Sequence, residues 1–237
     1  CGEPCPKHLG AHAHSDQLSF DLYYGEIPLI AEVGTSSYDY GSLRKYERSG
    51  KGHNLLQLSL FDKTKNKKWL EPVEVWSNFR VGFKCKPSWR KSGIKKDWIW
   101  SRGSHDGFDR IKSKHFRWIG INNSNNLVPL LIIIDAIHTK KKIRWRINNH
   151  FGPSYEKYFK KIGLKTKFFN LSGNYETYFE ESYLAKGYGI REKRMSKFQT
   201  GQFNPGKHIL ISLIYPKNLP YKIKPNPLKG QEDFLGN

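Results

Sequence analysis

Residues 11–35 read AHAHSDQLSFDLYYGEIPLIAEVGT, and this stretch decides which fold the sequence predicts. Two apolar runs, residues 18–24 and 27–33, stand on either side of the pair Gly25-Glu26. A two-residue connection that contains glycine, placed between two such runs, is typical of a β-hairpin. We therefore expect two antiparallel strands here.

The pair His12 and His14 lies just ahead of this predicted hairpin. In an extended strand, residues i and i+2 point to the same face, so we expect both imidazoles to project from one sheet surface. Neutral imidazole is a good ligand for Zn²⁺, and its titration near neutral pH suits proton transfer. The spacing alone is equally compatible with two partly exposed strand histidines that have no chemical role.

Short apolar or alternating runs continue along the chain, separated by Gly, Pro, Asn and Lys, and helical periodicity is almost absent. Residues 55–61 alternate most clearly, with Leu56, Leu58 and Leu60 on one face. Further strands are predicted at residues 73–76, 80–84, 98–101, 115–121, 130–137, 142–148, 166–170, 176–182 and 208–215. The pattern predicts an all-β fold, a large antiparallel multi-stranded β-sandwich of two sheets, over residues 1–216. Residues 217–237 are predicted to form a Pro-rich C-terminal tail.

The composition limits the classes of partner. The chain of 237 residues carries 41 Lys and Arg against 21 Asp and Glu, and the net charge of +20 points to a polyanion. The basic residues stand in scattered clusters, which are equally typical of solvated faces. No recognised nucleic-acid-binding motif is present, so nucleic acid is not the expected partner. The longest apolar stretch, residues 127–134, contains Pro129 and is too short to span a membrane.

Several ordered blocks of sequence carry a family resemblance. They are Gly2, residues 11–22, residues 27–35, residues 44–49, Gly52-His53-Asn54, residues 103–108, His115-Phe116-Arg117, Asp135 and Tyr188-Gly189. In order and spacing these blocks resemble the C-terminal β-domain of the heparinase II/III-like polysaccharide lyases. The resemblance implies a bacterial protein of the periplasm or cell envelope, although no signal sequence is visible in this chain.

The resemblance also implies a metal site, usually zinc, inside the β-domain. The matching positions are the second histidine of the pair, His14, the acid Glu32 and the histidine of the His-Asn pair, His53. Three such ligands leave a fourth position for water or another side chain, which is normal zinc chemistry. The family more often has Asp where this chain has Glu32, so the carboxylate is displaced by one methylene group.

His12 matches the family position that reaches into the cleft between the β-domain and an upstream helical α/α-toroid. Lyases of this class cleave acidic, uronic-acid-containing polysaccharides by β-elimination. A base removes the C5 proton while the neighbouring carboxylate is neutralised and the leaving oxygen is protonated. The resemblance makes His12 the candidate base or charge-stabilising partner. No helical stretch of toroid length is present, so a toroid domain is expected upstream or in trans, and the chain alone is not expected to complete the reaction.

Arg44 and Arg48 are the candidate substrate-binding residues, because a guanidinium can pair bidentately with a carboxylate or sulfate on a glycan. A surface loop whose arginines bind nothing in particular is an equally good interpretation. Residues 142–146 alternate Lys, Arg and Arg with Ile and Trp, which predicts a strand with one basic face that could line a polyanion-binding surface.

Two further groups of residues are interpreted as structural. His105, Asp106 and Arg110 lie in a turn-rich stretch and are expected to support a loop. The aromatic residues are expected to serve in core and edge packing rather than as sugar-stacking platforms. They are Trp76, Trp89, Trp98, Trp100, Trp118 and Trp145.

Two alternatives to a lyase domain are open from the sequence. A cupin also carries a pair of alternate histidines followed by a carboxylate and a third histidine, but the cupin carboxylate follows within a few residues, whereas Glu32 is far from His14. A non-catalytic, metal-containing glycan-binding or polyanion-binding β-sandwich module is the more serious alternative. It would keep the fold, the zinc and the basic surface without chemistry of its own.

Overall fold

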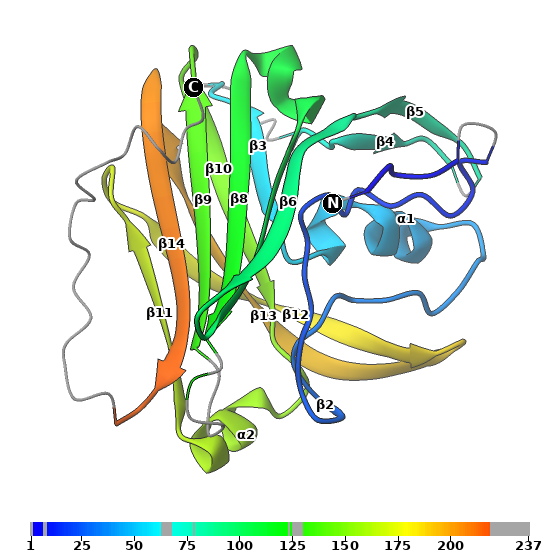
Figure 1. Cartoon of the computed structure of the whole chain (residues 1–237). Coiled ribbons are helices and arrows are strands. Elements are labelled where there is room, and N and C mark those ends of the chain that lie inside the picture. The colour runs from blue at the N-terminus through cyan, green and yellow to red at the C-terminus, as the bar shows by residue number, and fades with distance from the viewer. Residues whose placement is uncertain are drawn as a thin grey trace.

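The protein is described from a computed structural model, which covers residues 2–6, 9–62, 68–77, 79–122, 124 and 130–218. These residues form two large antiparallel sheets of six and four strands and two small two-stranded sheets. Figure 1 shows the two large sheets packed as layers, with the short helix α1 and the hairpin β4–β5 beside them. Of the described helices, none is long and apolar enough to cross a membrane.

The six-stranded sheet has the order β11-β14-β9-β8-β7-β6. Its strands are β6 (Pro87–Lys95), β7 (Trp98–His105), β8 (Ser113–Asn122), β9 (Leu130–Thr139), β11 (Leu164–Asn170) and β14 (Gly206–Pro216). The order follows the chain from β6 to β9, so these four strands form a meander of hairpins. Strand β14 then returns beside β9, and β11 closes the edge.

The four-stranded sheet has the order β12-β13-β10-β3. Its strands are β3 (Leu56–Leu60), β10 (Ile143–His150), β12 (Glu176–Gly187) and β13 (Ile190–Phe203). The small sheets pair β1 (Leu22–Tyr24) with β2 (Ile27–Ile30) and β4 (Val73–Val75) with β5 (Val81–Lys84). The helices are α1 (Ser42–Arg48) and α2 (Tyr155–Ile162), and two 3-10 turns are η1 (Gly50–Gly52) and η2 (Asp106–Ile111).

The main core lies between the two large sheets. Buried apolar residues of β3 and β10 meet residues of β9, β11 and β14 across the interface. Trp145 is fully buried at the centre of β10 and packs on Gly201, its register partner in β13. A Cβ at position 201 would lie 2.8 Å from the indole ring, so glycine is required there for the ring to reach the core.

The all-β, two-sheet sandwich predicted from the sequence is confirmed, and every strand predicted from residue 55 onward is present with bounds shifted by a few residues. Strand β10 has the predicted basic face, because Arg144 and Arg146 alternate with the core residues Ile143, Trp145 and Ile147. The prediction for residues 217–237 falls outside the described residues except for Lys217 and Asn218, which form a turn.

The first hairpin differs from the prediction. The strand expected at residues 18–24 covers only Leu22–Tyr24, and the partner expected at residues 27–33 ends at Ile30. Leu18 has a φ of 66°, in the left-handed region that strand residues rarely adopt, and its carbonyl accepts a hydrogen bond from Arg117 instead of from a strand. Residues 11–14 are turn and irregular chain, so the prediction that His12 and His14 share a strand face is wrong.

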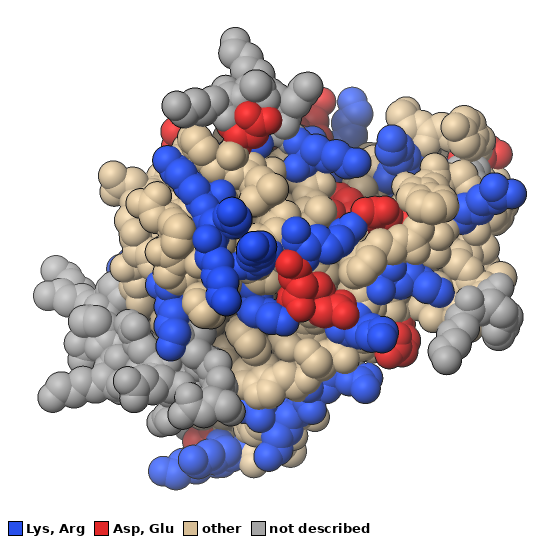
Figure 2. Space-filling model, turned by 90° about the horizontal axis from the view of Figure 1, so that it is seen from above, with Lys and Arg blue, Asp and Glu red and all other residues tan. Residues whose placement is uncertain are grey.

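Charge and aromatic residues are distributed unevenly over the surface. Figure 2 shows Lys and Arg side chains in several groups on the face seen from above, with acidic residues between them. The net charge therefore does not by itself locate a binding site. Trp145 is buried, as the packing interpretation expects, but Trp76 is 69% exposed and is not packed into the core.

Candidate functional site

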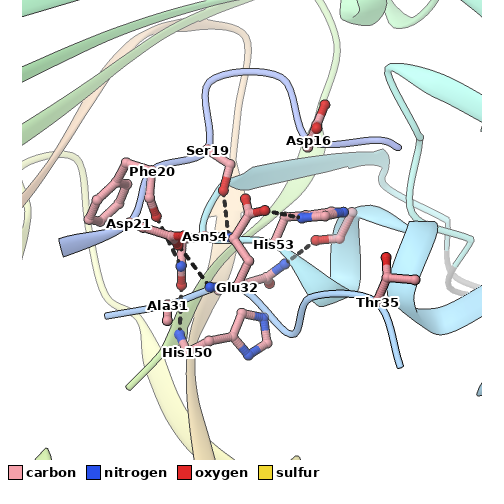
Figure 3. Close-up of polar contacts among 12 residues, drawn as sticks. Asp16, Ser19, Phe20, Asp21, Ala31, Glu32, Thr35, His53, Asn54 and His150 are labelled. Carbon is pink, nitrogen blue, oxygen red and sulfur yellow. Dashed lines mark hydrogen bonds and ion pairs between the residues drawn. The ribbon is translucent and has the colours of Figure 1, made fainter. Parts of the chain in front are cut away.

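The three predicted zinc-ligand residues lie together, although they come from three separate irregular segments. We call His14, Glu32 and His53 the histidine site. The ring centroids of His14 and His53 are 5.3 Å apart, and Glu32 Oε2 lies 2.9 Å from His53 Nδ1 in an ion pair. Figure 3 shows the Glu32 carboxylate reaching toward the His53 ring. His53 is almost fully buried, whereas the Glu32 side chain is partly exposed.

The two histidines of this site are in opposite protonation environments. Burial, together with the positive charges of His53, Arg44 and Arg48, lowers the pKa of His14 to about 3. Burial also opposes the charge on His53, but the Glu32 carboxylate beside it raises the pKa of His53 overall. His14 is therefore a neutral imidazole, and His53 is the partner of Glu32.

A buried arginine holds the segment that carries His12 and His14. Arg48, at the end of α1, is fully buried, and its Nε donates to the Ala13 carbonyl oxygen at 2.8 Å. Its Nη2 donates to the Gly10 carbonyl at 3.0 Å, and its Nη1 donates to the Ser77 carbonyl. Charge-assisted hydrogen bonds of this kind are stronger than neutral ones, so the loop is fixed without strand pairing.

A second buried arginine holds the segments next to His53. Arg117 in β8 pairs with Asp135 in β9, with Nε–Oδ1 and Nη2–Oδ2 distances of 2.7 and 2.9 Å. Its remaining Nη1 donates to the carbonyl oxygens of Leu18 and Asn54 at 2.8 and 2.9 Å. Despite the cost of its own burial, the charges of Arg117 and its neighbour His115 lower the pKa of Asp135 to about 2. The ion pair thus stays charged and anchors two site loops to the six-stranded sheet.

Asn54, the residue after His53, connects three segments around the histidine site through hydrogen bonds. Its side-chain amide donates to the Phe20 carbonyl at 3.0 Å, and its Oδ1 accepts from the His150 backbone N–H at 2.7 Å. Its own N–H donates to the Ser19 hydroxyl, as Figure 3 shows. One asparagine therefore joins the first loop, the His53 segment and the end of β10.

A third buried arginine holds the segment that carries Glu32. Arg194 in β13 donates from Nη1 to the Ala31 carbonyl at 2.6 Å. Burial lowers the pKa of Arg194 to about 10, which leaves it charged at neutral pH. The Glu32 N–H itself donates to Asp21 Oδ1 at 2.8 Å. The backbone on both sides of the Glu32 side chain is consequently fixed.

His12 lies at the exposed edge of this arrangement. Its ring centroid is 5.9 Å from that of Tyr38 in an edge contact, and Tyr38 stacks on Tyr188 at 6.4 Å. The guanidinium carbon of Arg44 lies 4.9 Å from the centroid of the Tyr38 ring. His12 is exposed and its neighbour His14 is half-buried and neutral, so His12 is the more accessible of the two to a substrate.

The two candidate substrate-binding arginines are both almost fully buried. The hydrogen bonds of Arg48 to three carbonyl oxygens define it as the residue that positions the His12 loop. Arg44 donates to Thr35 Oγ1 at 3.2 Å, and Arg44 and Arg48 both line a hollow of about 210 Å³ together with Tyr40 and Trp76. A role of either arginine in binding substrate remains a prediction.

The residues of the histidine site have the donor chemistry of a zinc site, but they do not already converge as ligands. Over the ranges that the structure covers, no group of three or more His, Cys, Asp or Glu side chains is arranged to hold a metal ion. His14 is neutral, however, and His53 Nε2 is buried with no hydrogen-bond partner in the described part of the chain. A buried ring nitrogen without a partner, on a histidine next to a neutral imidazole and a carboxylate, has the donor chemistry to bind a cation.

Several residues that build the site were not recognised as such from the sequence. Arg117 and Asp135 stood in the blocks that carried the family resemblance, but no role was assigned to them. Arg194 lies in a polar run that predicted no strand at all. The one signal for them is the presence of charged residues inside otherwise apolar strands, which requires a buried partner. His105 and Asp106 support a loop as expected, since His105 Nδ1 accepts from the Gly107 N–H and Asp106 Oδ1 accepts from the Lys86 N–H.

The fold and the site define the class of protein: a two-sheet antiparallel β-sandwich with a histidine–carboxylate site built on arginine-held loops. The chain belongs to the family described as Heparinase II/III-like, C-terminal, whose model matches residues 1–203. A comparison with curated proteins gives no match.

Solved structures of similar fold carry related names. A heparinase III with methylated lysines superposes with a TM-score of 0.63 at 15% sequence identity, over 91% of this chain and 31% of the other. Heparan sulfate lyase HepC from Pedobacter heparinus gives a TM-score of 0.61 at 15% identity, over 86% of this chain and 31% of the other. At such identities the likeness shows the fold, and the chain spans about a third of the length of these proteins.

Proposed function

We propose that this chain is the β-domain of a polysaccharide lyase that cleaves acidic, uronic-acid-containing polysaccharide by β-elimination. The observation that carries the proposal is the difference between the two histidines: His12 is exposed beside Tyr38, and His14 is half-buried against His53. In this proposal His12 removes the C5 proton or stabilises the charge that develops as it leaves. The backbone that carries His12 is fixed by Arg48, which keeps the imidazole in place.

We propose that His14, Glu32 and His53 hold Zn²⁺, in a structural role. When bound, zinc would join the His12–His14 loop to the segments that carry Glu32 and His53. The support is the neutral state of His14, the unpartnered Nε2 of His53 and the adjacent carboxylate. Binding requires Glu32 to exchange its ion pair with His53 for the metal.

Two further parts of the proposal concern partners and place. The catalytic groups that the β-domain lacks would come from an α/α-toroid domain, upstream in the same protein or in trans. The similar solved structures are about three times the length of this chain and so contain further chain beside the matched part, which is consistent with such a partner domain. The periplasm or cell envelope is the proposed compartment, on the basis of the family.

Metal analysis tests the zinc proposal directly. The purified chain is expected to contain about one equivalent of zinc, and His14→Ala is expected to lose it. His138→Ala, which removes an exposed histidine from β9, is the matched control and should retain the metal. A metal-free wild-type protein whose stability does not change when zinc is added would exclude the site.

The elimination reaction is tested through the ultraviolet absorbance of its unsaturated product. The chain is incubated with uronate polymers, alone and together with a separately produced toroid domain of the family. Product is expected only in the mixture, and His12→Ala should abolish it while His138→Ala does not. Product from the chain alone would show that no toroid is needed. Binding of the polymer without product in any mixture would favour the non-catalytic glycan-binding module instead.

A further inference from the structure

A groove of about 550 Å³ lies between α1 and the hairpin β4–β5, away from the residues of the histidine site. Its lining includes Lys45, Lys68, Trp69, Glu71, Trp76 and Arg146. We call it the Trp76 groove, and we propose that it binds an anionic sugar unit of a polysaccharide, through a carboxylate or sulfate group and through stacking on the indole ring. The volume falls within the usual range for sites that hold small ligands.

The floor of the groove contains a buried cation without an anion. Arg146 is only 5% exposed, and within the described chain its guanidinium forms no ion pair with a carboxylate, while its Nε has no hydrogen-bond partner. The guanidinium donates to Gln57 Oε1 and lies 4.6 Å from the centroid of the Trp69 ring. Buried charges in proteins are normally paired, so a bound anion would supply what this arginine lacks.

The nearby acid Glu71 feels the charge of Arg146 but forms no direct ion pair with it. Its Oε2 accepts from the Gly50 N–H at 2.7 Å, and its Oε1 accepts from Gln57 Nε2 at 3.1 Å. Burial raises the pKa of the Glu71 carboxyl. The carboxyl group is thus used to hold the turn η1 and the Gln57 amide, and these polar groups can also meet the hydroxyls of a sugar.

The wall of the groove is an exposed indole ring held in a fixed orientation. Trp76 is 69% exposed, yet a Cβ at Gly82 in β5 would lie 2.3 Å from two of its ring carbons. The ring therefore rests directly on the backbone of Gly82 and hydrogen-bonds the Glu74 carboxylate. A large apolar side chain fixed on one face and open on the other is a platform for the apolar face of a sugar ring.

The rim of the groove is basic and continues toward His12. Lys45 and Lys68 are exposed and form no ion pair within the described chain. Lys45, Val75 and Trp76 also line the hollow that contains Arg44 and Arg48. Because Arg44 contacts Tyr38, and Tyr38 contacts His12, a line of contacts joins the catalytic candidate to the groove. An extended polyanion could therefore contact His12 and the Trp76 groove at the same time.

The inference names the ligand as an acidic polysaccharide and in that respect rests on the proposed function. The test is direct binding, measured by calorimetry with two probes: a heparan sulfate tetrasaccharide and an unsulfated oligogalacturonate of equal length. Trp76→Ala is expected to weaken binding of at least one probe by about fivefold, as expected for loss of a central aromatic contact. Comparison of the two probes shows whether sulfate is needed or carboxylate suffices.

Matched variants separate the groove from general attraction. Phe79→Ala removes another exposed aromatic residue of the same hairpin and should bind as the wild type does. The double variant Lys45→Glu/Lys68→Glu should bind more weakly, whereas Lys157→Glu/Lys160→Glu, with the same change of charge on α2, should not. Equal losses in both double variants, or unchanged binding by Trp76→Ala, would overturn the proposal.

Two further measurements distinguish the possible failures. His14→Ala should still bind the probes, since the groove does not include the histidine site; binding that persists while zinc and elimination are absent would refute the proposed function alone. A single-stranded DNA oligomer of equal charge should bind more weakly than the sugar probes and should not respond to Trp76→Ala. A DNA affinity that is higher and falls in that variant would assign the groove to nucleic acid and overturn the inference.

Discussion

The histidine site and the Trp76 groove lie on either side of the same short segment, residues 50–53, but they are built in opposite ways. The histidine site stands on irregular loops, and buried arginines hold those loops through their carbonyl oxygens. The groove is built in part on strands, because its lining includes residues of β3, β4 and β10, and its indole wall, Trp76, directly follows β4 and rests on β5. A site on loops can combine residues distant in sequence, but its geometry then depends on the anchoring charges. The predictions below test this difference, from the largest expected effect to the smallest.

Removal of the central anchor is expected to have the largest effect. Arg117→Met leaves Asp135 as a buried carboxylate and frees the carbonyl groups of Leu18 and Asn54, so the free energy of unfolding should fall by about 3–5 kcal/mol. Urea unfolding measures the change. Arg90→Met, at an exposed position on β6, is the control and should stay within about 0.5 kcal/mol of the wild type. A loss under about 1 kcal/mol for Arg117→Met would show that the anchor is dispensable.

Acid is expected to have the next largest effect, because several histidines are held neutral in the folded protein, and the buried His105 and His150 are among them. Burial lowers the pKa of His105 to about 3 and that of His150 well below its usual value. Below pH 6.5 the unfolded chain binds protons that these residues cannot bind in the folded protein, so stability falls with pH. At pH 5.5 the loss should be about 3 kcal/mol relative to neutral pH.

Urea midpoints measured between pH 7.5 and 5.5, with a chelator present, check this acid effect. His105→Gln should reduce the slope by about one proton, since glutamine does not titrate. Asp135, with its pKa of about 2, contributes no slope in this window, because the stability it provides is lost only as the pH falls from about 4 toward 2. A slope that is flat in the wild type would contradict the assignment of neutral buried histidines.

Loss of the loop anchor Arg48 should have a smaller effect that is concentrated at the histidine site. Arg48→Gln removes hydrogen bonds to the carbonyls of Gly10, Ala13 and Ser77, and we expect a loss of about 2 kcal/mol. The zinc content of the protein should fall as well, because His14 is no longer held near His53. If the variant loses stability but retains full zinc content, the loop does not need its anchor to position the ligand.

Truncation in the groove should have the smallest effect on stability. Trp76→Ala removes a side chain that is 69% exposed, and the free energy of unfolding should change by no more than about 0.5 kcal/mol. Urea unfolding of Trp76→Ala beside Phe79→Ala provides the measurement. A loss above about 1.5 kcal/mol would mean that the indole ring serves packing, and the contrast between the two regions would then disappear.

The sequence was a better guide to the sheets than to the loops. Alternating residues predicted β3, β8, β9 and β10 correctly, because each has apolar residues that pack in one of the two large hydrophobic clusters. Strand β13 was missed because its buried residues on both faces include polar ones, Arg194, Ser196 and Gln199, which carry no apolar pattern. The edge strand β6 was missed for a related reason, since few of its residues are apolar and most are exposed.

The histidine site, too, was predicted in part: its residues were identified from the sequence, but their local geometry was not. The resemblance placed His14, Glu32 and His53 together, and the structure brings His53 next to both His14 and Glu32. The local geometry of His12 and His14 could not be inferred, because it depends on Arg48 and Arg117, which act on carbonyl oxygens that have no sequence signature. The exposure of Trp76 also could not be predicted from the sequence, since it depends on the glycine beneath the ring in the neighbouring strand.

The arginine anchors also determine when the site can form during folding. Arg117 follows Leu18 by 99 residues, and Arg194 follows Ala31 by 163 residues. On a ribosome, the loops that carry His14 and Glu32 are therefore made early but receive their anchors only after most of the domain has emerged. Contacts so distant in sequence also form slowly, because a long loop must close first. An ordered histidine site is thus a late event, and its appearance reports that both sheets are complete.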